Sequence, residues 1–94
     1  MPDTIYYVYI MSNATGSVFY IGVTEDLTKR VHEHKLLQIS GISAKYRIDR
    51  LLHFETYSSA DEAKQREQHM QTWRRSRKIS FIEQNNPHWQ ELHL

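Results

Sequence analysis

The chain has no cysteine and few of the residues that interrupt regular structure, with three glycines and two prolines among its 94 residues. Without cysteine, neither a disulfide framework nor a thiolate zinc site can form. Residues 1–4 carry no basic group, and no apolar run long enough for a signal peptide or a membrane helix follows them. We therefore expect one soluble, cytoplasmic domain over residues 1–94, with a single modest core.

Several common functional motifs are also absent. The sequence has no glycine-rich phosphate loop and no serine-centred nucleophile motif. Among the six histidines, His32 and His34 are two positions apart on a predicted helix, so their side chains diverge. The remaining histidines show no spacing typical of zinc ligands. These absences disfavour P-loop enzymes, serine hydrolases and histidine-based zinc proteins.

The net charge of +1 says little about partners, but the distribution of charge is uneven. Residues 45–78 hold nine basic and five acidic side chains, a difference of +4. A basic segment of this kind is either a phosphate-binding surface or an ordinary solvated helix surface, and both interpretations stay open. The candidate phosphate contacts are Lys29, Lys45, Arg47, Arg74, Arg75 and Lys78.

The hydrophobic pattern predicts three strands and three helices. Strands are expected at residues 5–11, 18–23 and 51–57, with the first two joined by a polar turn into a hairpin. Helices are expected at residues 27–37, 60–73 and 75–84, and residues 39–48 are expected to be irregular. The order β-β-α-β-α-α predicts an α+β domain with a small three-stranded antiparallel sheet flanked by helices.

The helix predicted at residues 27–37 has an unusual inward face. Leu27, Val31 and His34 share this face, and Arg30 borders it. Arginine is rarely buried without a partner, so a carboxylate or a bound phosphate is expected nearby. The preceding segment is interpreted as a strand that ends in a tight turn at Gly22, and either Thr24 or Asp26 can cap the helix.

Glu67 is the most informative single residue. The pair Ser59 and Glu62 forms a capping-box pattern that starts the helix at Ala60. Glu67 then falls within that helix's inward stripe. The other members of the stripe are Ala60, Ala63 and Met70. A glutamate there is costly unless it is paired or bound to a cation, so either an ion pair with Arg30 or a metal is expected.

Tyr9 and Tyr20 lie on adjacent predicted strands, and together with the polar helix residues they suit phosphodiester hydrolysis. Glu67 would bind a divalent metal such as Mg²⁺, which prefers carboxylate oxygen and retains water ligands. Arg30 would stabilise charge on the pentacovalent transition state. A tyrosine or His34 would accept a proton from the attacking water.

The spacing of these residues resembles the GIY-YIG nuclease superfamily over nearly the whole chain. Tyr9 lies in a first motif that has Tyr7 in place of its glycine, and Tyr20-Ile21-Gly22 follows as the complete second motif eleven positions later. The chain resembles small stand-alone bacterial members, related to the N-terminal nuclease of the excision-repair incision subunit. The resemblance implies the site residues Tyr9, Tyr20, Arg30, His34, Glu67 and Asn86.

The resemblance also implies roles for these residues. Tyr9 is implied as a general-base candidate, Tyr20 as the residue that orders the nucleophile or the site, and Glu67 as the ligand of one Mg²⁺ or Mn²⁺. The family's late asparagine corresponds to Asn86 because Pro87 follows it, with the adjacent Asn85 as the alternative and an ordinary helix stop as a further interpretation.

Three functions are compared on this basis. The favoured one is a metal-dependent endonuclease acting on DNA, in repair or recombination, with no membrane partner and as a monomer. The first alternative is a nucleic-acid-binding module of the same fold that does not cleave. The second is an interaction protein in which Trp73 and Trp89 form an exposed partner surface.

Overall fold

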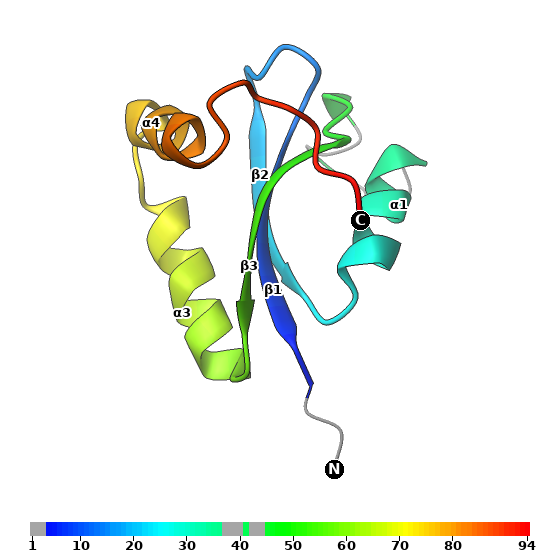
Figure 1. The fold of residues 1–94 in the computed structure, drawn as a ribbon, viewed down its shortest axis with the longest axis vertical. Coiled ribbons are helices and arrows are strands. Elements are labelled where there is room, and N and C mark those ends of the chain that lie inside the picture. The colour runs from blue at the N-terminus through cyan, green and yellow to red at the C-terminus, as the bar shows by residue number, and fades with distance from the viewer. Residues whose placement is uncertain (1–3, 37–40, 42–44) are drawn as a thin grey trace.

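The computed structural model describes residues 4–36, 41 and 45–94. Its centre is one antiparallel sheet of β1 (Tyr6–Ser12), β2 (Phe19–Thr24) and β3 (Arg50–Tyr57), in the order β2-β1-β3. The sheet lies between two layers, with α1 and the C-terminal tail on one face and α3 and α4 on the other (Figure 1). The predicted α+β class and the element order are confirmed.

The hairpin of β1 and β2 places the two motif strands side by side. Asn13 closes its loop, because the side-chain Oδ1 accepts hydrogen bonds from the backbone N–H of Ser17 at 2.9 Å and of Val18 at 3.1 Å. The resulting register pairs Tyr9 with Gly22. Since side chains alternate across a strand, the register brings the rings of Tyr9 and Tyr20 to the same face of the sheet.

The tight turn predicted at Gly22 is wrong. Gly22 is buried within β2, and the chain continues as strand to Thr24. A Cβ atom added at Gly22 would lie 2.7 Å from Tyr9 Oη and 2.9 Å from Tyr20 Cε1. The glycine is therefore needed for the close approach of two tyrosine rings, and not for a reversal of the backbone.

Helix α1 (Leu27–Lys35) covers the face of the sheet that carries these rings. Asp26 is its cap and accepts a hydrogen bond from Lys29 N–H at 3.1 Å, while the Thr24 hydroxyl accepts one from Asp26 N–H. The buried residues of the helix are Leu27, Val31 and His34, as predicted. The predicted end of this helix at residue 37 and half of the irregular segment 39–48 lie outside the described residues.

Helices α3 (Ala60–Gln71) and α4 (Arg75–Asn85) cover the opposite face (Figure 1). Ser59 caps α3 by accepting a hydrogen bond from Glu62 N–H at 3.3 Å, as the capping-box pattern predicts. Within the predicted inward stripe, Ala63 and Met70 are buried, whereas Ala60, the first residue of the helix, is exposed.

The tail after α4 packs against the sheet at β3. Leu92 N–H donates to Leu51 O at 2.8 Å, and the ring of Trp89 lies 6.1 Å from that of Phe19, centroid to centroid. Trp73 is buried against the core beneath α3 and α4, so an exposed surface that includes this tryptophan is not formed. None of the helices in the described ranges combines the length and apolar character that a membrane crossing needs.

Candidate active site

Three aromatic side chains meet between the sheet and α1. The rings of Tyr9 and Tyr20 are stacked with centroids 6.0 Å apart, and the imidazole of His34 stands edge-on to both, at 6.1 Å and 5.0 Å. Tyr9 and His34 are almost completely buried, whereas Tyr20 is partly exposed. The cluster therefore has a buried interior and one member that reaches the surface.

The hydroxyl of Tyr9 is buried and makes no hydrogen bond of good geometry among the described residues, but it lies next to the side chains of Arg30 and Tyr20, which interact with it. Burial raises the pKa of Tyr9, and the neighbouring Tyr20 adds to this effect, while the positive charge of Arg30 opposes it. The Tyr9 phenol thus keeps its proton at neutral pH. The Tyr9 hydroxyl is thus coupled to the Arg30 guanidinium at the edge of the cluster.

Arg30 borders the cluster from α1 and remains partly exposed. Burial by itself would lower its pKa, but attraction to Tyr9, Tyr20 and Glu33 raises it overall. Its guanidinium pairs with Glu33 at 3.4 Å, one turn along the helix. The ion pair between Arg30 and Glu67 is not formed, because α1 and α3 cover opposite faces of the sheet.

His34 is held in the neutral form. Burial lowers its pKa and the charge of Arg30 lowers it further, although a hydrogen bond to the backbone of Ile48 and the charge of Glu33 act in the opposite direction. An imidazole whose pKa lies below the usual value is unprotonated near pH 7 and can accept a proton there.

Glu67 lies on α3, in the layer on the other face of the sheet from the aromatic cluster. Gln71, one turn further along α3, donates from its side-chain amide to Ile21 O at 3.3 Å. Residues four apart share a helix face, so Glu67 also faces β2, which is an edge strand. Glu67 is partly buried and forms no ion pair within the ranges that the structure describes.

A surface hollow of about 230 Å³ opens along β2 between these groups. Its lining residues are Phe19, Tyr20, Ile21, Gln71 and Lys78. Tyr20 thus connects the aromatic cluster to the surface, and Lys78 adds a positive charge. The sequence interpretation missed Gln71, although its position four residues after Glu67 placed it on the same face of the helix.

A second hollow, of about 280 Å³, lies beside the start of α1. Its lining residues are Thr24, Glu25, Asp26, Lys29, Arg30 and Glu33. Lys29 and Arg30 place two cations here, next to three carboxylates. The predicted phosphate contact Lys29 therefore lies beside Arg30, in a locally mixed electrostatic environment.

Asn86 is the C-cap residue of α4, and its side chain contacts a different strand from those that carry the tyrosine pair. Its side-chain amide donates to Leu52 O at 3.1 Å and to Gln90 O at 2.8 Å, and its Oδ1 accepts from Gln90 N–H at 3.1 Å. Leu52 belongs to β3, on the far side of β1 from β2. The structure thus uses Asn86 to attach the tail to the sheet, while Asn85 donates to Phe81 O at 2.9 Å.

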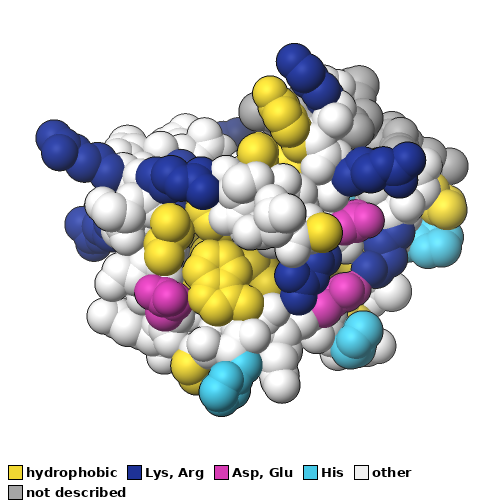
Figure 2. Space-filling model, turned by 90° about the horizontal axis from the view of Figure 1, so that it is seen from above, with side chains coloured by type: hydrophobic (Ala, Val, Ile, Leu, Met, Phe, Trp, Pro, Cys, Tyr) yellow, Lys and Arg dark blue, Asp and Glu magenta, His cyan; other side chains and the backbone are white. Residues whose placement is uncertain are grey.

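The remaining basic candidates divide between two regions. Lys45 and Arg47 are exposed before β3, whereas Arg74 and Arg75 flank the start of α4. Arg75 is partly engaged, because it donates to Ser17 O and lies 5.6 Å from the Phe19 ring centroid. Figure 2 shows Lys and Arg side chains on both sides of one end of the molecule, around hydrophobic groups, and not as one continuous patch.

A comparison with protein families agrees with this geometry. The family described as the GIY-YIG catalytic domain matches residues 5–80, which include both tyrosines, Arg30, His34 and Glu67 but not Asn86. The chain therefore belongs to the GIY-YIG family, which is a family of nucleases.

The relatives of this chain are small proteins known as UPF0213. One from Bacillus pumilus is 37% identical, over 84% of this chain and 80% of that protein. Another, from Lacticaseibacillus paracasei, is 33% identical over 95% of this chain and 99% of that protein. A UPF0213 protein of Bacillus halodurans, solved by NMR in solution, matches with a TM-score of 0.58 and 24% identity. The match covers 90% of this chain and 89% of the Bacillus halodurans chain, so the two proteins share a fold.

Proposed function

We propose that this protein is a divalent-metal-dependent endonuclease that hydrolyses phosphodiester bonds of DNA. The observation that carries the proposal is the cluster in which the buried Tyr9 hydroxyl lies beside Tyr20, His34 and the partly exposed Arg30, in a member of a nuclease family. A role in repair or recombination is the cellular function that this activity would serve.

Arg30 and Tyr9 would bind the scissile phosphate. The guanidinium is partly exposed, always charged and held at the edge of the cluster, so it can balance negative charge that develops on the phosphate oxygens. Tyr9 keeps its proton at neutral pH, so its hydroxyl can donate a hydrogen bond to a phosphate oxygen. Lys29 and Lys78 line the two hollows on either side of this position and would hold neighbouring phosphates.

Glu67 is the residue that would hold a metal ion. Within the described ranges no three His, Asp or Glu side chains gather into a metal site, so the chain offers one carboxylate and not a cage. This fits Mg²⁺ or Mn²⁺, since Mg²⁺ is commonly bound by one or two carboxylates together with water and substrate phosphate. When bound, the ion would supply positive charge that polarises the phosphate.

The proton of the attacking water has two candidate acceptors. His34 is neutral near pH 7 and needs no prior deprotonation, whereas Tyr9 would have to lose its own proton first. The pH–rate profile separates them. With His34 as the base, the rate levels off near neutral pH. With Tyr9 as the base, it rises tenfold per pH unit into the alkaline range.

The proposal is tested by cleavage of labelled duplex, flapped, branched and single-stranded DNA with Mg²⁺ or Mn²⁺. Wild type should cut at least one form, EDTA should stop it, and Glu67→Gln should lower the rate by at least about 100-fold. Glu83→Gln, an exposed substitution of the same type on α4, is the control and should keep full activity. Absence of cutting by the wild type at enzyme excess would overturn the proposal.

A binding module without cleavage is the second candidate. The first turn of α4 favours it, because Arg74, Arg75 and Lys78 gather there beside the hollow on β2. DNA binding that weakens steeply with salt, in a protein that cuts no DNA, would support this function over the nuclease.

A further inference from the structure

A larger hollow, of about 400 Å³, lies between α3 and α4 on the face of the sheet opposite the tyrosine cluster. We refer to it as the interhelical hollow. Its lining residues are Arg66, Trp73, Arg77, Ser80, Phe81 and Gln84. The lining thus combines two arginines, two aromatic rings and two polar side chains, and it contains no carboxylate.

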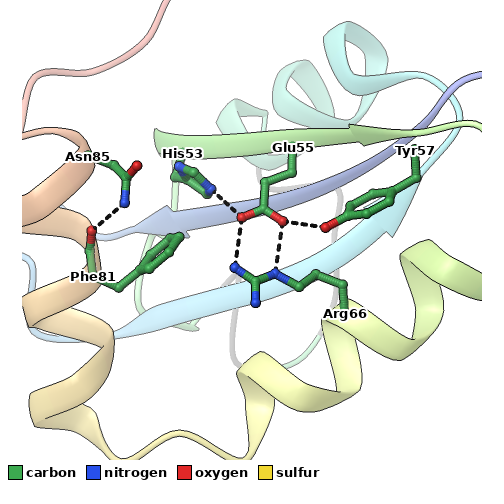
Figure 3. A network of polar contacts seen from close by, with 6 residues as sticks. All are labelled: His53, Glu55, Tyr57, Arg66, Phe81 and Asn85. Atoms are coloured by element: carbon green, nitrogen blue, oxygen red, sulfur yellow. Dashed lines mark hydrogen bonds and ion pairs between the residues drawn. The ribbon is translucent and has the colours of Figure 1, made fainter.

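Arg66 is held in this hollow by hydrogen bonds to Glu55. Its Nε and one terminal nitrogen donate to the two oxygens of Glu55, at 2.9 Å and 3.1 Å. The same carboxylate contacts His53 at 2.9 Å and accepts from the Tyr57 hydroxyl at 2.8 Å (Figure 3). A guanidinium has five N–H groups, so this pairing holds the side chain in place and leaves donors for another group.

The pKa of Glu55 indicates that its carboxylate remains ionised while it holds Arg66 in place. Burial alone would raise its pKa, but the hydrogen bonds from His53, Arg66 and Tyr57 lower it to about 2. Glu55 therefore stays ionised at neutral pH and neutralises Arg66, whereas Arg77 in the same hollow has no such carboxylate among the described residues.

The arginines are arranged around aromatic rings. The guanidinium of Arg77 lies 4.5 Å from the Trp73 ring centroid, and that of Arg66 lies 5.3 Å from Trp73 and 5.6 Å from Phe81. Trp73 also has a buried indole N–H with no acceptor in the described part of the chain. Buried donors normally have a partner, which can be protein or water.

We propose that the interhelical hollow binds one nucleotide of a single-stranded stretch of the DNA substrate. Arg66 and Arg77 would contact its phosphate, and its base would lie against Phe81. Arginine suits phosphate because its planar guanidinium can donate two parallel hydrogen bonds. An unpaired base is stabilised by stacking on an aromatic ring. A base in duplex DNA has no free face to offer, so the hollow selects substrates with an unpaired segment.

This inference rests on the proposed function and adds a substrate class to it. The link between the two sites is the first turn of α4, where Arg77 lines the interhelical hollow and the next residue, Lys78, lines the hollow on β2. Adjacent helix residues point about 100° apart, so the two side chains project from neighbouring faces of the same turn of α4. A strand held at Tyr20 can therefore pass over this turn to reach Arg77.

The test measures binding of fluorescein-labelled (dT)12 in EDTA, so that cleavage does not interfere. Arg77→Gln removes an exposed charge from the hollow, and Lys64→Gln removes an exposed charge from α3 outside it. We expect Arg77→Gln to weaken binding about tenfold and to reduce the salt slope by about one, and Lys64→Gln to weaken it less than about twofold. Equal effects of the two variants would overturn the inference.

A second readout does not depend on charge. In Trp89→Phe, Trp73 is the single tryptophan, and we expect its fluorescence to be quenched by (dT)12 with the midpoint seen in the binding curve. Unchanged Trp73 fluorescence at saturation would contradict binding in the hollow. Thymidine monophosphate should bind far more weakly than (dT)12. Equal affinity per site, lost in Arg77→Gln, would indicate a free-nucleotide site and overturn the strand assignment.

The binding assay and the cleavage assay can fail independently. If wild type cuts DNA but neither the affinity nor the fluorescence depends on the hollow, the nuclease proposal stands and this inference falls. If the binding results hold but no DNA is cut, the nuclease proposal falls and the assignment of single-stranded nucleic acid to the hollow stands.

Discussion

The hydroxyl of Tyr9 and the backbone of Gly22 lie so close across the β1–β2 pair that a Cβ at residue 22 would be 2.7 Å from Tyr9 Oη and 2.8 Å from Cζ. This contact explains why the two family motifs occur together. The first motif supplies a ring that lies over the second motif's glycine, and the second motif supplies the tyrosine that stacks on that ring. The two motifs therefore form one packing unit.

Gly22→Ala should disrupt this unit. The added methyl group cannot fit beneath the two rings, which are part of the strand packing and cannot swing away freely. We expect a loss of about 1–3 kcal/mol in the free energy of unfolding, measured by urea denaturation, and a large loss of cleavage activity because Tyr9 is displaced.

Gly41→Ala is the informative control for this substitution. Gly41 has a φ of 80° but no atom of the described residues within 4 Å of its Cβ position, so alanine there meets backbone strain and no contact with them. We expect Gly41→Ala to lower the free energy of unfolding by about 1 kcal/mol and to retain activity. If Gly22→Ala behaves no worse than Gly41→Ala, the rings do not require the glycine.

His34 should make the fold sensitive to mild acid. Its pKa is lowered in the folded protein, so the unfolded chain binds the proton more readily. Stability should therefore be complete above the unfolded pKa of about 6.5 and fall as the pH decreases below it. His34→Gln should flatten this part of the stability–pH curve, as measured by thermal unfolding between pH 5 and pH 8.

His32→Gln is the matched control, since His32 lies exposed on the same helix. It should leave the pH dependence of stability as in the wild type. A wild-type curve that is flat through this range, or one that His32→Gln changes as much as His34→Gln, would contradict the burial argument.

Glu55 should control stability in stronger acid. Its pKa of about 2 in the folded protein lies below its ordinary value of 4.5, so its contribution is present above pH 4.5 and is lost as the pH falls toward 2. The full effect is at most about 3 kcal/mol. Urea denaturation at pH 2–5 should show a steeper acid loss for wild type than for Glu55→Gln, and parallel curves would contradict the assigned network.

Asn86→Ala should show whether Asn86 only attaches the tail to the sheet or also takes part in catalysis. The substitution removes three hydrogen bonds, two of them to the backbone of Gln90 and one to Leu52 O, so we expect a loss of about 2–3 kcal/mol in stability. If Asn86 acts only by holding the tail, the single-turnover rate of the folded fraction stays at the wild-type value. A rate loss at temperatures where the variant is fully folded would place Asn86 at the site, as the family resemblance implies.

The sequence alone predicted the element order because the local signals were strong. Alternating β-branched and aromatic residues marked the strands, Ser59 and Glu62 marked the start of α3, and Leu27, Val31 and His34 marked the buried face of α1. Each of these signals depends on residues within a few positions of one another, so no tertiary information was needed.

The errors and omissions came from contacts between distant residues. A turn was predicted at Gly22 because the sequence does not show which side chains pack against a glycine. In the structure, the rings of Tyr9 and Tyr20 pack against it. The network at Glu55 was missed, although His53, Glu55 and Tyr57 alternate along one strand and so share a face. Only the packing of α3 shows that Arg66 completes it.

The most direct test of the account is the DNA cleavage rate of Tyr9→Phe, measured together with its stability. Removing this buried hydroxyl, which makes no hydrogen bond of good geometry among the described residues, should change the free energy of unfolding by no more than about 1 kcal/mol in either direction. If that hydroxyl serves the phosphate, the rate should fall by about 100-fold or more. Tyr6→Phe, on the opposite face of the same strand, should cut normally. A stable Tyr9→Phe protein that cuts at the wild-type rate would contradict the proposed active site.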